Sequence, residues 1–210
     1  MIEAFLKFFV VFFVVVSPIS ILPEFASLTD GATTAYKKRM AVKATVSSAL
    51  IVVLFAVAGT ALLDALGISI QSFRIFGGVL LFLVALEMVF ARESGTRTSA
   101  DEQAESRRRA DISVFPLAFP LLAGPGALTT ILLAFGRVSP WQEPLTFLVL
   151  LLAAWVVLAI AFVLMLSAER VTRLIGQTGS NVANRLLGVV LGALAVQFVV
   201  DGIRATFFAA

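Results

Sequence analysis

The chain has 210 residues, of which 60% are hydrophobic and only 14% are charged, and its mean hydropathy is +1.04. Soluble domains carry about 25% charged residues, so this composition excludes an ordinary soluble protein and predicts a polytopic membrane protein. The absence of cysteine and histidine excludes disulfides, thiolate chemistry, histidine-ligated metal and histidine general-base catalysis. The net charge of +3 comes mostly from loops, so we expect it to set membrane orientation, not to bind nucleic acid.

Six apolar stretches have the length of a membrane-spanning helix, which needs about 20 residues. We therefore predict an all-α fold with six transmembrane helices. The expected ranges are 2–22, 41–63, 75–91, 112–135, 145–166 and 182–207. Glu3 precedes the first apolar run and no small-residue cleavage site follows it, so we interpret this run as a retained span and not as a signal peptide.

The first span ends in a proline-containing stretch, SPISILPEFASLT, at residues 17–29. Proline removes a backbone donor and clashes with the preceding turn, so Pro18 and Pro23 predict a broken helix. Glu24 follows Pro23, and we expect its carboxylate to cap a short helix after the break.

The fourth span contains a second such stretch, SVFPLAFPLLAGPGALTT, at residues 113–130. Gly124, Pro125 and Gly126 predict a break there, because glycine adds backbone freedom next to a proline. A shift of 102 residues superposes Pro18 on Pro120 and Pro23 on Pro125. In lipid a broken backbone survives only where it is packed in protein or lines a wet cavity. We therefore expect both breaks to lie inside the protein and to line an internal space.

A charged segment, residues 92–111, divides the chain into two halves of three spans, residues 1–91 and 112–210. We interpret it as a solvated cytoplasmic linker, and its run Arg107–Arg109 as either part of that linker or an attachment point for anionic lipid or a regulator. An odd number of spans per half forces opposite orientations. Since Arg74 and Arg185 each begin an Arg-x-x-Gly pattern, we predict two inverted repeats, the architecture of secondary transporters.

The basic residues predict the orientation. Twelve lie in the loops or at the span ends on one side of the membrane, and four lie toward the other side. Cytoplasmic loops carry the excess of Lys and Arg, so both termini are expected outside the cytoplasmic (inner) membrane of a bacterium.

Four segments together resemble the MarC family of bacterial and archaeal membrane proteins: SPISILPEFASLT, RIFGGVLLFLVALEMVF, FPLAFPLLAGPGALTTILL and RLLGVVLGALAVQFVVDGI. The family looks related to LysE-type exporters, and some members are described as transporters of small neutral amino acids such as glycine and alanine. The resemblance implies a secondary transporter that exports or exchanges such substrates. Family members often have N-P-x-G at the first proline motif, where this chain has Ser17 and Ser20. No P-loop pattern occurs, so we expect no ATP-driven step in this chain.

A zwitterionic amino acid needs donors for its carboxylate and acceptors for its ammonium group. The half-helix that begins near Gly126 would offer free N–H groups, and carbonyls freed near Pro120 and Gly124 would offer acceptors. Hydroxyls would add further contacts, unless they bond back to their own helices, and the glycines have tight packing as an alternative role. The candidate substrate-binding residues are Ser17, Pro18, Ser20, Pro23, Pro120, Gly124, Pro125, Gly126, Thr129 and Thr130.

Three further polar residues, Glu24, Glu87 and Gln197, are candidates for coupling. For Glu87, snorkelling to the nearby cytoplasmic surface or pairing there is the competing interpretation. We expect Asp201 to pair with Arg204, and Gly188 and Gly192 to form a packing face.

We assign no catalytic residue, metal or cofactor. The expected partners are a small neutral amino acid and the lipid bilayer, and assembly with further copies of the chain stays open. Two alternatives without transport stay open. One is a lipid-handling protein or membrane enzyme, for which Glu24 and Glu87 are the only acidic candidates on the cytoplasmic side. The other is a regulatory or structural subunit.

Overall fold

The computed structural model describes residues 1–90, 111–136, 138 and 140–207, and within these ranges every regular element is helical. The elements are α1 (Ile2–Val16), α2 (Pro18–Leu28), α3 (Thr34–Ala65), α4 (Ile70–Phe90), η1 (Ser113–Leu122), α6 (Pro125–Phe135), α7 (Pro144–Leu166) and α8 (Ala168–Phe207). Five helical stretches are long and apolar enough to span a membrane, and the bent pair η1 and α6 raises this to six. The all-helical, multispanning fold is therefore confirmed. The proposed linker, residues 92–111, lies almost wholly outside the described residues.

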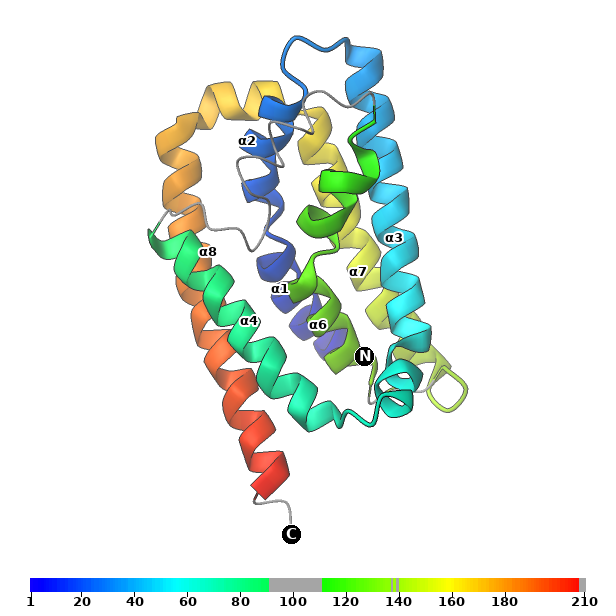
Figure 1. Ribbon diagram of the computed structural model, residues 1–210. Coiled ribbons are helices and arrows are strands. Elements are labelled where there is room, and N and C mark those ends of the chain that lie inside the picture. Colours follow the sequence, from blue (N-terminus) through cyan, green and yellow to red (C-terminus); the bar gives the residue numbers. More distant parts are fainter. Residues whose placement is uncertain (91–110, 137, 139, 208–210) are drawn as a thin grey trace.

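The spans run back and forth between two ends of the molecule (Figure 1). α1 begins and α8 ends at the lower end of that view, as an even number of crossings requires. α1 and α2 form one broken span, and η1 and α6 form the other. The two predicted broken helices are therefore the first and the fourth spans.

Several helices extend beyond the apolar stretches that predicted them. α3 begins at Thr34, where the Thr33 hydroxyl accepts from the N–H of Tyr36 (3.3 Å), seven residues before the apolar run. α8 begins at Ala168, in what we expected to be a loop, and it turns at Gly176, whose φ of 68° suits glycine. Hydropathy detects only the part of a helix that lies in lipid, and these helices continue into polar sequence.

The first break is a single residue. Ser17 has φ 47° and ψ 65°, in the left-handed region, and its N–H donates to the carbonyl of Phe13 (2.9 Å), which ends α1. Pro18 then begins α2, where a proline is favoured because the first helical N–H has no partner in any case. Pro23 lies inside α2, so our prediction of a break there is wrong. Its ring removes only one backbone bond, and the helix continues to Leu28.

The segment that precedes the second break, η1, is less regular than the helix that precedes the first. In η1 the residues before two prolines, Phe115 and Phe119, have extended backbones, as the proline ring demands of its predecessor. Wide turns result, such as the bond from the Ala123 N–H to the carbonyl of Ala118 (2.8 Å). Pro125 then begins α6 at an angle of 57° to η1. Pro18 and Pro125 therefore occupy equivalent positions, because each is the first residue after its break. The 102-residue shift, which pairs Pro18 with Pro120, does not superpose the two breaks.

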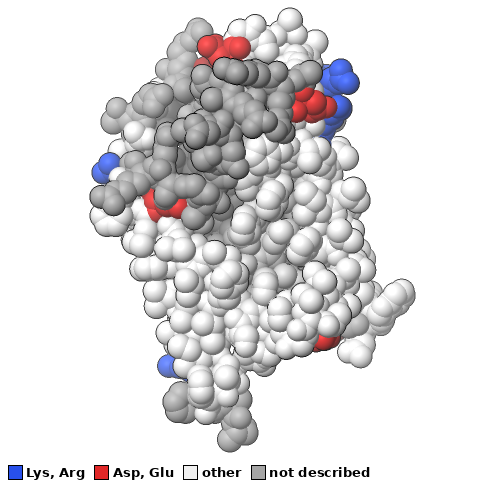
Figure 2. Space-filling model, viewed as in Figure 1, with Lys and Arg blue, Asp and Glu red and all other residues white. Residues whose placement is uncertain are grey.

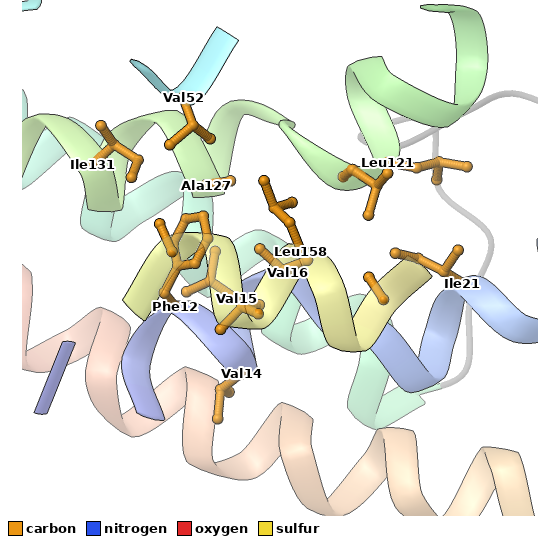
Figure 3. Close-up of a cluster of buried hydrophobic side chains, with 14 of the residues drawn as sticks. Phe12, Val14, Val15, Val16, Ile21, Val52, Leu121, Ala127, Ile131 and Leu158 are labelled. Atoms are coloured by element: carbon orange, nitrogen blue, oxygen red, sulfur yellow. The ribbon is translucent and has the colours of Figure 1, made fainter. Parts of the chain in front are cut away.

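The first span is the centre of the bundle. Of its most apolar window, 56% is buried, against 22–28% for α3, α4 and the apolar part of α8, so those three helices present most of their surface outward. Side chains of α1, including Phe12 and Val15, lie among residues of the surrounding helices such as Val52, Ala127 and Leu158 (Figure 3). A broken span at the centre leaves both of its helix ends inside protein.

Charged side chains gather toward the ends of the molecule. On the face drawn in Figure 2, they lie in the upper part and at the lower edge, and the surface between is uncharged. At the upper end Lys37 pairs with Glu169, and Lys43 Nζ lies 2.5 Å from Asp111 Oδ2. These ion pairs tie the starts of α3, α8 and the second half together.

Asp111 anchors the start of the second half, and its role predicts a pH dependence. The hydrogen bond from Lys43 and those from the hydroxyl and N–H of Ser113 hold the pKa of this carboxyl well below its usual range. A lowered folded pKa gives stability that is present above the unfolded pKa of about 3.9 and lost as the pH falls through the folded value.

We expect Asp111→Asn to lower the unfolding free energy at pH 7 by no more than about 1 kcal/mol, because the Lys43–Asp111 pair is half exposed. Heat unfolding in detergent at pH 7 and again well below pH 3.9 measures this. The difference between the two proteins should shrink at the acid pH, and an undiminished difference there would contradict the assignment.

Candidate functional site at the meeting of the two breaks

A cavity of about 160 Å³ lies where the two broken spans meet. Val15 and Val16, at the end of α1, form one wall, and the segment 120–127 around the second break forms another. The third wall is α4, with Leu80, Leu81 and Val84. Four of the candidate substrate-binding residues line this cavity together: Pro120, Gly124, Pro125 and Gly126.

The α6 wall offers hydrogen-bond donors. Gly124 makes no side-chain cap for α6, and Pro125 has no N–H. The first intrahelical bond runs from the Leu128 N–H to the Gly124 carbonyl (3.0 Å), so the N–H groups of Gly126 and Ala127 precede it. Both residues line the cavity. The positive end of a helix dipole therefore faces it. The Gly124 carbonyl accepts that bond, so it is not one of the freed carbonyls that we expected near Pro120 and Gly124.

The α1 wall offers acceptors. Pro18 has no N–H for the carbonyl of Val14, and the N–H of Ser20 bonds to the Ser17 carbonyl (2.9 Å) instead of reaching back to Val16. The last carbonyls of a helix have no partner within it. Val15 and Val16 line the cavity at this negative end of α1. Donors and acceptors thus come from the backbones of two different half-helices.

The size and lining of the cavity limit what it can hold. An apolar cavity of about 150 Å³ binds a molecule of about six non-hydrogen atoms. Leu80, Leu81, Val84 and Leu121 present only hydrocarbon. A fitting ligand is therefore small, with polar groups at two ends and little or no side chain.

The two glycines at the break have different steric roles. A Cβ on Gly124 would lie 2.1 Å from the carbonyl oxygen of Pro120, which is backbone. A Cβ on Gly126 would lie 2.8 Å from Leu81 Cδ2 and 3.2 Å from Val15 Cγ1, both ends of side chains that line the cavity. Gly124 permits the turn itself, whereas Gly126 keeps space open beside it.

The two threonines of α6 have other surroundings. The Thr130 hydroxyl donates to the carbonyl of Gly126 in its own helix (2.9 Å), the alternative we considered. Thr129 packs against Gly77 of α4, where a Cβ would lie 1.9 Å from its methyl carbon. Neither residue is among those that line the cavity.

Ser17 and Ser20 form a polar chain with a residue that the sequence reading missed. Their Oγ atoms lie 2.6 Å apart, and the Ser20 hydroxyl donates to Oδ1 of Asn184 in α8 (2.8 Å). Ser17 is fully buried and Ser20 nearly so. Asn184 could have been recognised in the sequence, because it is a polar side chain two residues inside the predicted sixth span.

The coupling candidates lie apart from the cavity lining. Glu24 is the seventh residue of α2, so it does not cap that helix. Glu87 is half-buried in the last two turns of α4. Gln197 is exposed and donates to Asp201 (2.8 Å), and the described residues show no ion pair between Asp201 and Arg204, so that expected pair is wrong.

The comparisons with known proteins agree on one family. Residues 2–207 match the family model described as MarC family integral membrane protein. The chain is 34% identical to the UPF0056 membrane protein YhcE of Escherichia coli, over 97% of this chain and 93% of that protein. It is likewise 34% identical to the UPF0056 membrane protein MJ1677 of Methanocaldococcus jannaschii, over 96% of this chain and 97% of that one. No solved structure gives a significant match.

Proposed function

Because the chain belongs to the MarC family of integral membrane proteins, we propose that it is a secondary transporter that exports or exchanges small neutral amino acids. The observation that carries the proposal is the 160 Å³ cavity between the two breaks, which is lined by the first residues of α6 and the last residues of α1.

The two helix ends match the two charges of a zwitterion. The substrate carboxylate would accept from the N–H groups of Gly126 and Ala127, at the positive end of α6. Its ammonium group would donate to the carbonyls at the end of α1. Neither contact needs a charged side chain, and the hydrocarbon wall of α4 leaves room only for a very small substituent. Glycine and alanine satisfy these conditions.

The order of the helices supports inverted repeats. In each half a broken span precedes two unbroken ones, and the equivalent spans run in opposite directions (Figure 1). In transporters built this way, one half rocks against the other around a site at their interface. The cavity would be that site, since α1 and α4 come from one half and α6 from the other.

Purified protein in proteoliposomes is expected to move labelled glycine or alanine down an imposed gradient. The control is an equal preparation of vesicles without the protein, and a second control uses a bulky amino acid such as tryptophan, which the cavity is too small to hold. Absence of flux for every small neutral amino acid, in vesicles that are sealed and contain folded protein, would contradict the proposed substrate class.

The membrane and orientation are also part of the proposal: an inner membrane, with both termini outside the cytoplasm. The twelve basic residues on one side of the spans, against four on the other, support it. A reporter that is active only in the cytoplasm should be silent when fused after Ala210 and active when inserted between residues 92 and 111. Activity after Ala210 would reverse the orientation.

A further inference from the structure

The first break is tied to α8 by a hydrogen-bond chain whose direction can be assigned. The Ser20 hydroxyl donates its one hydrogen to Asn184 Oδ1 (2.8 Å), so in the 2.6 Å contact between Ser17 and Ser20 the donor is Ser17. The chain therefore runs from Ser17 through Ser20 to Asn184. The amide oxygen of Asn184 is the acceptor that orders it.

The break needs such a restraint, because Ser17 occupies a conformation that serine rarely adopts. Its φ of 47° is the only positive φ of a residue other than glycine in the described part of the chain. Helix ends of this kind usually carry glycine or asparagine. A residue in this region persists only where its surroundings hold it there. For Ser17 the surroundings are full burial and the hydroxyl bond toward α8.

The conformation of Ser17 leaves the last carbonyls of α1 without helical partners, because it ends the helix there. Ser17 follows Val16 directly and ends the helix, and Val15 and Val16 line the cavity. If Ser17 were helical, α1 would continue into α2, and the N–H groups of Ile19 and Ser20 would bond to the carbonyls of Val15 and Val16. The contacts that hold Ser17 in this conformation therefore keep the carbonyls of Val15 and Val16 available to a ligand.

We propose that Asn184 is a positioning residue for the ammonium end of the substrate site, acting through Ser20 and Ser17 on the carbonyls of Val15 and Val16. The inference rests on the proposed transport function. Asn184 itself need not touch the substrate, since it is not among the residues that line the cavity.

The test compares uptake kinetics of alanine in proteoliposomes for Asn184→Leu and Asn184→Asp. Leucine removes the acceptor, and we expect KM to rise about tenfold, the change that loss of one hydrogen bond to a charged group produces, while kcat stays within about twofold. Aspartate keeps an acceptor oxygen in the same place, so KM should return toward the wild-type value. Should Asn184→Leu fail to fold, Ser20→Ala and Ser20→Thr form the equivalent pair.

A matched control separates positioning from general loss of polar contacts. Ser48 is as buried as Ser17, but its hydroxyl bonds to the carbonyl of Ala44 in its own helix (2.8 Å). Ser48→Ala should leave the KM for alanine unchanged. The double variant Ser20→Ala/Asn184→Leu should raise KM no more than either single change. The two residues belong to one hydrogen-bond chain, so the effects of their substitutions are not additive.

Two results would overturn the assignment: a KM within about twofold of wild type for Asn184→Leu, or a raised KM that Asn184→Asp does not restore. Failure of the proposed function looks different, because the wild-type protein would then show no uptake. In that case the positioning role of Asn184 would be rejected together with the proposed transport function.

Discussion

Replacing Gly126 with leucine is expected to abolish amino acid uptake and to leave membrane insertion intact. The new side chain would start 2.8 Å from Leu81 Cδ2 and extend into the 160 Å³ cavity, which has about the volume that leucine needs. The neighbours that must move, Leu81 and Val15, meet it with the ends of their side chains. The cavity that we propose as the substrate site would therefore be filled while the fold adapts.

Uptake of labelled alanine, together with the amount of folded protein in the membrane, measures both parts of this prediction. Gly188→Leu is the matched comparison. A Cβ there would lie 2.8 Å from Met88 Cβ and 3.1 Å from the carbonyl oxygen of Ala85, in the contact between α4 and α8. It should reduce the yield of folded protein. Normal uptake by Gly126→Leu would rule out this cavity as the substrate path.

The second large effect is on stability. Gly124→Ala would place a methyl group 2.1 Å from the backbone oxygen of Pro120. The backbone of η1 has to shift to relieve this contact, and overpacking of this kind costs about 3 kcal/mol. We expect a clear fall in the midpoint of heat unfolding in detergent. The φ of Gly124, −73°, suits any residue, so the effect is steric and not conformational.

Gly192→Ala provides the control for Gly124→Ala. The added Cβ would meet Ala85 Cβ at 3.6 Å, an ordinary contact, and alanine favours a helix interior more than glycine does. Its unfolding midpoint should equal or exceed that of the wild type. If Gly124→Ala were as stable as Gly192→Ala, the close approach at the second break would be refuted.

The membrane fold and the two broken spans could be predicted from the sequence, because they depend on local properties. An apolar run of about 20 residues suits lipid wherever it lies in a chain. Pro18 and Pro125 each withhold a backbone donor from the preceding turn, and each is favoured as the first residue of a new helix. The same logic misjudged Pro23, since one lost backbone bond inside α2 does not end a helix that is packed on its neighbours.

The composition of the site was predictable only in part. Pro120, Gly124, Pro125 and Gly126 stand out in the sequence as breaker residues, and they line the cavity. Val15, Val16 and Leu81 carry no signal, because one apolar residue of a span resembles another until the helices are packed. Gln197 appeared comparable to a site residue, yet it lies on an exposed face of α8, and the rotation of a helix is decided by its neighbours.

By itself, then, the sequence determined that this chain spans a membrane with two interrupted helices, since burial in lipid and loss of backbone hydrogen bonds are properties of each segment alone. Only the tertiary structure decided that the negative end of α1 and the positive end of α6 meet at one cavity, and that Asn184 reaches Ser20. These contacts join residues separated by more than 100 positions. Their geometry follows from the packing of the other five spans around the first, which no local pattern encodes.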